Sequence, residues 1–152
     1  MKRLFIILVL SSIIYTLGYQ YLLGQGNKEN VYCTSSGAIE GYDPVAYFTE
    51  GTPVEGKASI SYDWRGADWH FSTEEHKSMF MENPEKYAPE YGGFCAYAVS
   101  QGYKAEIDPY AWHIEGSKLY LNYDMNVQKK WMENRKELIK EADKNWEMIS
   151  GK

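Results

Sequence analysis

The sequence lacks the short signatures by which the common enzyme classes are recognised. It contains no glycine-rich nucleotide-binding loop, no Gly-x-Ser-x-Gly nucleophile motif and no His-Glu-x-x-His zinc motif. It has only three histidines, and none of them has a partner at the His-x-x-x-His spacing. These absences predict a protein that is not an enzyme.

Positive charge and internal repeats are also scarce. The 152 residues include 16 Lys and Arg against 21 Asp and Glu, which gives a formal net charge of −5. Residues 1–26 carry only Lys2 and Arg3, so the rest of the chain carries −7. Such an acidic chain binds a phosphate backbone poorly, which excludes nucleic acid as the expected partner. Without repeats, the length suits one compact domain with an N-terminal appendage.

The appendage has the character of a targeting segment. Lys2 and Arg3 precede twenty uncharged residues, 4–23, which is close to the length that spans a bilayer. No Ala-x-Ala cleavage site follows. We therefore expect a signal peptide or membrane anchor over 1–26, a linker over 27–31 and a domain over 32–150. That domain is expected to be exported, periplasmic or otherwise extracytoplasmic, with membrane contact only through residues 4–23.

The domain itself is predicted to be α+β. Apolar residues alternate on both sides of 65–67 and of 115–118, which predicts two antiparallel hairpins forming a small sheet. Ser72-Thr73-Glu74-Glu75 matches a capping box that opens a helix, and Gly92-Gly93 precedes a short helix that stops at Gly102. From Asp124 onwards, apolar residues recur at helical spacing and predict a C-terminal amphipathic helix. Aromatic residues make up 16% of the chain and are interpreted as core packing.

Several of these segments resemble the YHS domain family, a short module found alone and attached to metal-handling proteins. The segments that carry the resemblance are Gly41-Tyr42-Asp43-Pro44-Val45-Ala46-Tyr47-Phe48, Trp69-His70-Phe71-Ser72, Asn83-Pro84-Glu85-Lys86-Tyr87, Tyr91-Gly92-Gly93-Phe94-Cys95-Ala96 and Lys118-Leu119-Tyr120-Leu121-Asn122. Together they extend over about 32–146 and look like an exported branch of the family. The resemblance implies a fold rather than an activity.

The sequence departs from the metal-binding relatives at the ligand positions. Where the resemblance implies cysteines, this chain has Ala46, Ser72 and His76. Alanine has no ligand atom, and a neutral serine hydroxyl is a weak ligand for soft or borderline metals. A thiolate-rich site therefore does not carry over.

Three residues stand out as candidate metal ligands, each with a structural alternative. Cys95 is placed at a predicted helix start, where amide dipoles favour the thiolate and lower its pKa; alternatively it is a small buried hydrophobe. His76 occupies a position that relatives use for a ligand, or it packs on Phe71 as the fifth residue of the capping box. Asp43 precedes Pro44, where a carboxylate either caps a turn or accepts a metal.

Function and redox state stay open at this point. Cys33 and Cys95 either form one disulfide or remain thiols. The leading hypothesis is a YHS-like binding module for a small ligand or a transition metal ion, copper, zinc or iron, held by Cys95, His76 and Asp43. The alternatives are a protein-protein interaction or structural domain of the cell envelope, and a thiol-dependent enzyme that uses Cys95.

Overall fold

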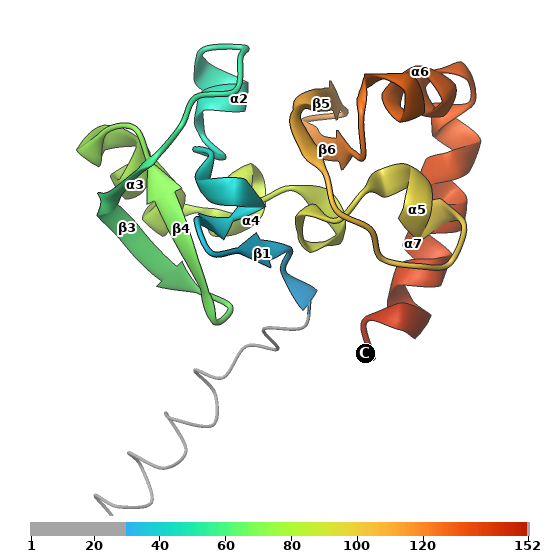
Figure 1. Ribbon diagram of the computed structural model, residues 1–152, viewed down its shortest axis with the longest axis horizontal. Helices are drawn as coiled ribbons and strands as arrows, with labels where there is room; N and C mark the ends of the chain where they lie inside the picture. The colour runs from blue at the N-terminus through green and yellow to red at the C-terminus, as the bar shows by residue number, and fades with distance from the viewer. Residues whose placement is uncertain (1–29, 152) are drawn as a thin grey trace, which may run out of the picture.

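Residues 30–151 are described by a computed structural model, and they form the predicted α+β fold (Figure 1). Three antiparallel hairpins make three separate two-stranded sheets. They pair β1 (Cys33–Thr34) with β2 (Gly37–Ala38), β3 (Lys57–Trp64) with β4 (Ala67–Phe71), and β5 (Asp108–Glu115) with β6 (Lys118–Asn122). Both predicted hairpins are therefore confirmed, although they do not join into one sheet.

Both predicted hairpins turn through two residues with positive φ. Arg65 and Gly66 have φ of 54° and 71°, and Gly116 and Ser117 have φ of 58° and 63°. Two left-handed residues in succession match the right-handed twist of the flanking strands, as in a type I′ turn. Glycine takes this conformation without strain, which explains its place in each turn.

Short helices connect the hairpins and longer ones end the chain. The short ones are α2 (Ala46–Thr49), α3 (Glu74–Glu82), α4 (Pro84–Tyr87) and α5 (Ala96–Ser100), with 3-10 turns η2 (Ile39–Gly41) and η3 (Glu90–Gly93). The C-terminal pair is α6 (Met125–Glu133) and α7 (Arg135–Ile149). Figure 1 shows β3, β4, α2 and α3 in one half of the molecule, and β5, β6, α5, α6 and α7 in the other.

Helix α3 begins one residue later than the capping box predicted. Its N-cap is Thr73, whose side chain accepts a hydrogen bond from the His76 backbone amide at 3.1 Å. The hydroxyl of Ser72 is bound instead to Asp43 Oδ2 at 2.7 Å. Ser72 therefore does not cap the helix, because its hydroxyl is bound to a residue far away in the sequence.

The C-terminal amphipathic segment is divided at Asn134, whose φ of −133° interrupts the helix. Asp124 caps α6 through a 2.7 Å bond from the Val127 amide, at the predicted helix start. Trp131 and Ala142 are fully buried, and Leu138 and Trp146 pack against the same cluster. The predicted apolar face thus packs on the domain, although two helices carry it.

Aromatic side chains fill two adjoining cores. In the first, the rings of Trp69 and Phe80 lie 5.3 Å apart; in the second, those of Tyr120 and Trp131 lie 5.3 Å apart. All four side chains are at most 2% exposed. Large aromatic rings bury much area per residue, which suits a domain of this size.

The predictions for residues 1–26, and most of the linker prediction for 27–31, lie outside the described residues. Within 30–151, none of the helices combines the length and the apolar character that crossing a bilayer requires.

Candidate functional site

Asp43 and His76, two of the predicted ligands, lie in direct contact. His76 Nδ1 is 2.6 Å from Asp43 Oδ2. The same oxygen accepts hydrogen bonds from the Ser72 amide at 2.8 Å and from the Ser72 hydroxyl at 2.7 Å. Asp43 Oδ1 accepts from the amides of Val45 and Ala46 at the start of α2, at 2.9 and 3.4 Å. This fully buried carboxylate therefore joins α2, the end of β4 and α3.

The second ring nitrogen of His76 faces the end of α2. His76 Nε2 lies 3.2 Å from Thr49 Oγ1 and 3.9 Å from Glu50 Oε1. The Thr49 hydroxyl donates to the Val45 carbonyl at 3.2 Å. The imidazole therefore lies between a buried carboxylate and the Thr49 hydroxyl, and these three side chains link α2 to α3.

Cys95 has a different set of neighbours. Its Sγ accepts hydrogen bonds from the amides of Ala98 at 3.5 Å and Tyr123 at 3.2 Å, and it lies 3.9 Å from Asn122 Oδ1. Cys95 is the N-cap of α5 rather than a residue of its first turn. It is 1% exposed and is a free thiol.

The expectation of a lowered thiol pKa at Cys95 is wrong. Burial raises the pKa, and this effect outweighs the opposing hydrogen bonds from the amides of Ala98, Tyr123 and Tyr97. A helix start favours the thiolate only where solvent can reach the sulfur. Cys95 therefore behaves as the small buried hydrophobe that the sequence offered as its alternative.

We expect Cys95 to be alkylated slowly in the native protein. Thiolate is the reacting species, and burial disfavours it as well as blocking access. In a Cys33→Ser variant, iodoacetamide should modify Cys95 at least about tenfold more slowly than after unfolding in urea. Mass spectrometry of timed samples measures the two rates. Equal rates at neutral pH would show an accessible thiol and contradict the structure.

The three predicted ligands do not fit a metal ion. Asp43 uses both oxygens for protein donors, and His76 Nδ1 is bound to Asp43. The Cys95 sulfur already accepts from two amides. Among residues 30–151 there is no group of three or more His, Cys, Asp or Glu side chains placed to hold a metal. No step of the proposed function is therefore assigned to a metal ion at these residues.

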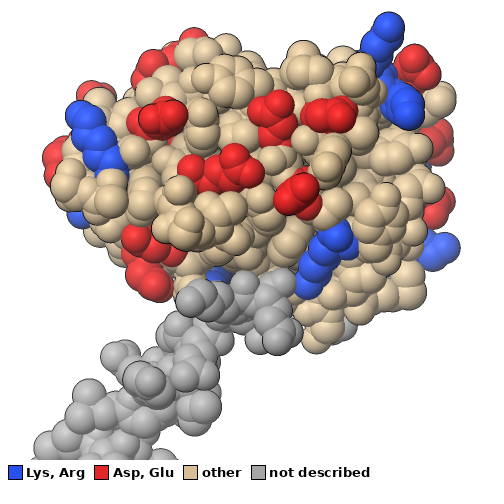
Figure 2. Space-filling view, viewed as in Figure 1, with Lys and Arg blue, Asp and Glu red and all other residues tan. Residues whose placement is uncertain are grey.

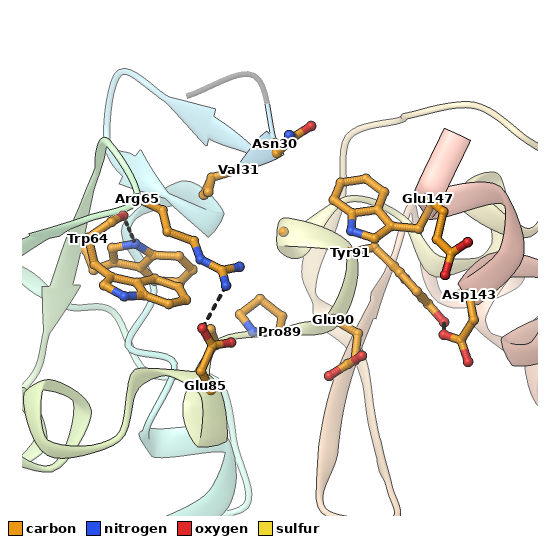
Figure 3. Close-up of a pocket in the computed structure, with 14 residues that line it drawn as sticks. Asn30, Val31, Trp64, Arg65, Glu85, Pro89, Glu90, Tyr91, Asp143 and Glu147 are labelled. Atoms are coloured by element: carbon orange, nitrogen blue, oxygen red, sulfur yellow. Dashed lines mark hydrogen bonds and ion pairs between the residues drawn. The ribbon is translucent and has the colours of Figure 1, made fainter. Parts of the chain in front are cut away.

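A pocket of about 540 Å³ lies elsewhere, where the two halves of the molecule meet (Figure 3). Its walls come from the start of the described chain, the β3–β4 hairpin, the segment from α4 to η3, and α7. The lining residues are Asn30, Val31, Trp64, Arg65, Trp69, Glu85, Ala88, Pro89, Glu90, Tyr91, Gly92, Asp143, Trp146 and Glu147. Four are Trp or Tyr and four are Asp or Glu. Its volume lies in the range of small-molecule sites, and its lining is both aromatic and charged.

On the hairpin side, two residues of the pocket wall form a cation–π contact with each other. The Arg65 guanidinium carbon lies 4.4 Å from the centre of the Trp64 ring, and Arg65 Nη2 lies 2.7 Å from Glu85 Oε1. Figure 3 shows this pair on one side of the pocket, with Glu90 and Pro89 between it and the opposite wall. Arg65 is thus held by both a ring face and a carboxylate.

On the α7 side, Tyr91 donates its hydroxyl to Asp143 Oδ1 at 2.9 Å (Figure 3). Burial raises the pKa of Tyr91, and the Asp143 carboxylate raises it further, so the hydroxyl keeps its proton as a donor. The Tyr91 backbone has φ of 57°, a left-handed conformation that is uncommon outside glycine. Strained backbone of this kind often occurs at binding sites.

The sequence did not single out this pocket. Its aromatic residues were assigned to core packing, which describes Trp69 and Tyr91, both at most 5% exposed. Asp143 and Glu147 lie in the segment that was predicted only as a C-terminal amphipathic helix. The helical spacing of Asp143, Trp146 and Glu147 could have shown that they share one face, but not what that face meets.

Comparison with known proteins gives one match. Residues 45–91 match the family described as YHS domain. No curated protein and no solved structure matches the chain. The matched segment contains His76 and much of the pocket lining, from Trp64 to Tyr91, whereas Asn30, Val31 and α7 lie outside it.

Proposed function

Residues 45–91 of this chain form a YHS domain, and from this premise we propose that the protein is a binding module whose site is the pocket between that domain and α7. The observation that carries the proposal is the lining. Trp64 and Trp146, which are half-buried, offer apolar ring surface, while carboxylates and Arg65 offer a few orienting charges. This combination is what small-molecule sites use to bury a ligand and fix its orientation.

The pocket also depends on parts of the chain that pack on the YHS domain. Asn30 Nδ2 donates to the Ser150 carbonyl at 2.8 Å, which ties the start of the described chain to the end of α7. The Tyr32 amide donates to the Gly92 carbonyl at 2.9 Å. These bonds hold the walls in place before any ligand arrives, and such preorganisation favours affinity.

The other expectations remain predictions. Export rests on residues 2–23, outside the described part of the chain. A role in protein-protein interaction rests on exposed aromatic side chains such as Tyr103 and Tyr110. A thiol-dependent reaction receives no support from the buried position of Cys95.

Filling the pocket should weaken small-molecule binding at least about tenfold. Ala88 lines the pocket and is half-buried, so an Ala88→Phe substitution adds a ring where a ligand would lie. We expect compounds of about ten non-hydrogen atoms, drawn from amines, alcohols, carboxylates and sugars, to include binders in the millimolar range or tighter, as expected for such small ligands. Isothermal titration calorimetry on the full-length chain in a non-ionic detergent measures the affinities.

The matched control is Ala58→Phe, which places the same ring on an exposed position of β3 outside the pocket lining. Every binder should keep its affinity in Ala58→Phe and lose at least about tenfold in Ala88→Phe. Binders that are insensitive to Ala88→Phe, or a complete lack of binders, would remove the pocket as the site.

A further inference from the structure

We propose that the chain contains two copies of one structural unit, a first unit of residues 39–87 and a second unit of residues 90–138. The matched YHS segment, 45–91, lies almost entirely in the first unit. The second unit is then a second YHS-like unit, in which Cys95 and Val127 occupy the positions of Asp43 and His76. This inference goes beyond the proposed function, since it requires no ligand in the pocket.

The elements of the two units follow one another at a constant spacing. Helix α3 begins at residue 74 and α6 at residue 125, which is 51 residues later, and each has nine residues. The same spacing separates the starts of η2 and η3, at 39 and 90, and those of α4 and α7, at 84 and 135. Within η2 and η3, Glu40 and Tyr91 have nearly the same left-handed backbone, with φ of 61° and 57°. Figure 1 shows β3, β4 and α3 in one half of the molecule and β5, β6 and α6 in the other.

The two hairpins agree residue by residue. Adding 51 to both residue numbers of any β3–β4 pair gives a β5–β6 pair, and the register shifts between the same two pairs in each hairpin. A bulge at an equivalent place is a specific feature of a fold, not a general property of hairpins. The first hairpin pairs Lys57 with Phe71, Ser61 with His70, Tyr62 with Trp69, Asp63 with Asp68 and Trp64 with Ala67, and the second pairs Asp108 with Asn122, Trp112 with Leu121, His113 with Tyr120, Ile114 with Leu119 and Glu115 with Lys118.

The helix that follows each hairpin is capped in the same way at both ends. Thr73 caps α3 and Asp124 caps α6, each by accepting a bond from the amide three residues later. Both helices end in the same three residues, Met81-Glu82-Asn83 and Met132-Glu133-Asn134, with the asparagine as C-cap. The units therefore share their boundaries as well as their strand pairing.

Asp43 and Cys95 lie at the same place in their units, although 52 rather than 51 residues separate them. Both are at most 1% exposed, and each lies just before a short helix, α2 or α5. The Asp43 amide donates to the Val54 carbonyl at 2.8 Å, and the Cys95 amide donates to the Ala105 carbonyl at 3.1 Å. These two carbonyls are again 51 residues apart.

The side chains of Asp43 and Cys95 also accept from equivalent amides. Each accepts from the amide three residues later and from the amide just before the N-cap of the next helix. These donors are Ala46 and Ser72 for Asp43, and Ala98 and Tyr123 for Cys95. His76 and Val127 are each the third residue of that next helix. The second unit thus keeps the amide bonds with a thiol and a valine, so the fold of the unit does not require the carboxylate and imidazole.

Surface residues hide the repeat in the sequence. Figure 2 shows acidic side chains spread across the middle of the visible face, with basic ones mostly towards its edges, a pattern that does not separate the two units. Aromatic character is kept only in the core, where Trp69 corresponds to Tyr120 and Phe80 to Trp131, all at most 2% exposed. Cores accept such exchanges when the apolar pattern is kept. This explains why the sequence predicts a chain without repeats.

The units differ most where the pocket lies. Helices α4 and α7 begin at equivalent positions, but α4 has four residues and α7 has fifteen. Three pocket residues, Asp143, Trp146 and Glu147, belong to the part of α7 after residue 138, which has no counterpart in the first unit. This wall of the pocket is therefore an addition to the common unit.

Transfer of the Asp43–His76 pair into the second unit tests the equivalence. Cys95→Asp alone places a carboxylate in a buried position without a histidine, and it should lower the folding equilibrium constant at least about tenfold. Val127→His, added to Cys95→Asp, should recover at least about tenfold, because its imidazole would lie beside the carboxylate as His76 lies beside Asp43. Urea denaturation of the full-length chain in a non-ionic detergent measures both changes.

The matched control is Met125→His, which places a histidine at an exposed position of the same helix. Combined with Cys95→Asp, it should recover less than about twofold, as expected for an exposed pair without contact. Equal recovery by the two histidines, or no recovery by Val127→His in chains that fold, would overturn the equivalence.

The reverse exchange decides the matter if the Cys95→Asp chains do not fold. Asp43→Cys/His76→Val copies the second unit into the first, and Asp43→Val/His76→Val is a control of similar size without an acceptor. The Ser72 amide should exchange its hydrogen at least about threefold more slowly in the Cys variant, because a sulfur can accept from it as Cys95 accepts from Tyr123. Equal exchange rates would contradict the proposal. Neither residue 43 nor residue 76 lines the pocket, so failure here leaves the proposed binding site in place.

Discussion

An Asp43→Asn substitution should lower the free energy of unfolding by about 3 kcal/mol or more, because it removes a fully buried charge from a network that was built around it. The carboxylate accepts from His76 Nδ1, from the amide and hydroxyl of Ser72, and from two amides at the start of α2. Asparagine has the same shape, but an NH₂ group replaces one of the two carboxylate oxygens. That NH₂ group would then lie against hydrogen-bond donors and could not accept from them. Urea denaturation followed by tryptophan fluorescence measures the loss.

The chain supplies a matched control at Asp68, which also contacts a histidine. Asp68 Oδ2 lies 3.0 Å from His70 Nε2, but its side chain is 55% exposed. An exposed pair contributes about 1 kcal/mol or less, so Asp68→Asn should change stability only slightly. Ser72→Ala removes a single donor to Asp43 and should cost about 1 kcal/mol. Equal losses in the Asp43 and Asp68 variants would show that burial does not strengthen the Asp43 network.

The network around Asp43 shows what a sequence reveals of a site and what it does not. A turn cap was one of the two roles predicted for Asp43 because it precedes proline, and its bonds to Val45 and Ala46 confirm that role. Its contact with His76, 33 residues away, depends on how α3 packs on α2. The capping pattern at Ser72 failed for the same reason, since local motifs are read without knowledge of distant partners.

Regular elements were predicted where local patterns determine them. The alternation around 65–67 and 115–118 gave both hairpins, because a strand with one buried face must alternate. The helix after Gly92-Gly93 was also found, yet the state of Cys95 was not. Burial of a sulfur is a property of tertiary packing, and here it reverses the effect that the helix start alone would have on the thiol pKa.

The pocket was not predicted, because its walls come from segments that are far apart in the sequence. Asn30 and Glu147 both line it, and they are brought together by the bond from Asn30 to the Ser150 carbonyl. A pattern search follows neighbours in sequence, whereas this site is defined by the docking of α7 and the first described residues on the segment that matches the YHS domain.

That docking can be tested at Gly92, where we expect the second large effect on stability. A Cβ at Gly92 would lie 1.7 Å from the Asn30 carbonyl oxygen and 2.8 Å from its carbon. These are backbone atoms, so the contact cannot be relieved by rotation of a side chain. Gly92 also has φ of 63°, which disfavours alanine. We expect Gly92→Ala to lower the free energy of unfolding by about 3 kcal/mol or more, because strain at φ and a steric clash add together.

Gly102→Ala separates the two causes. Gly102 has φ of 88°, but a Cβ there meets no atom within 4 Å, so only the backbone cost of about 1–2 kcal/mol applies. Urea denaturation of both variants gives the difference. Hydrogen exchange of the Tyr32 amide, which donates to the Gly92 carbonyl, should become faster in Gly92→Ala and stay unchanged in Gly102→Ala. Losses of the same size in the two variants would mean that residues 30–32 are not held against η3. The pocket would then lack the wall formed by Asn30 and Val31 until a ligand bound. The free energy needed to order that wall would reduce the affinity for the ligand.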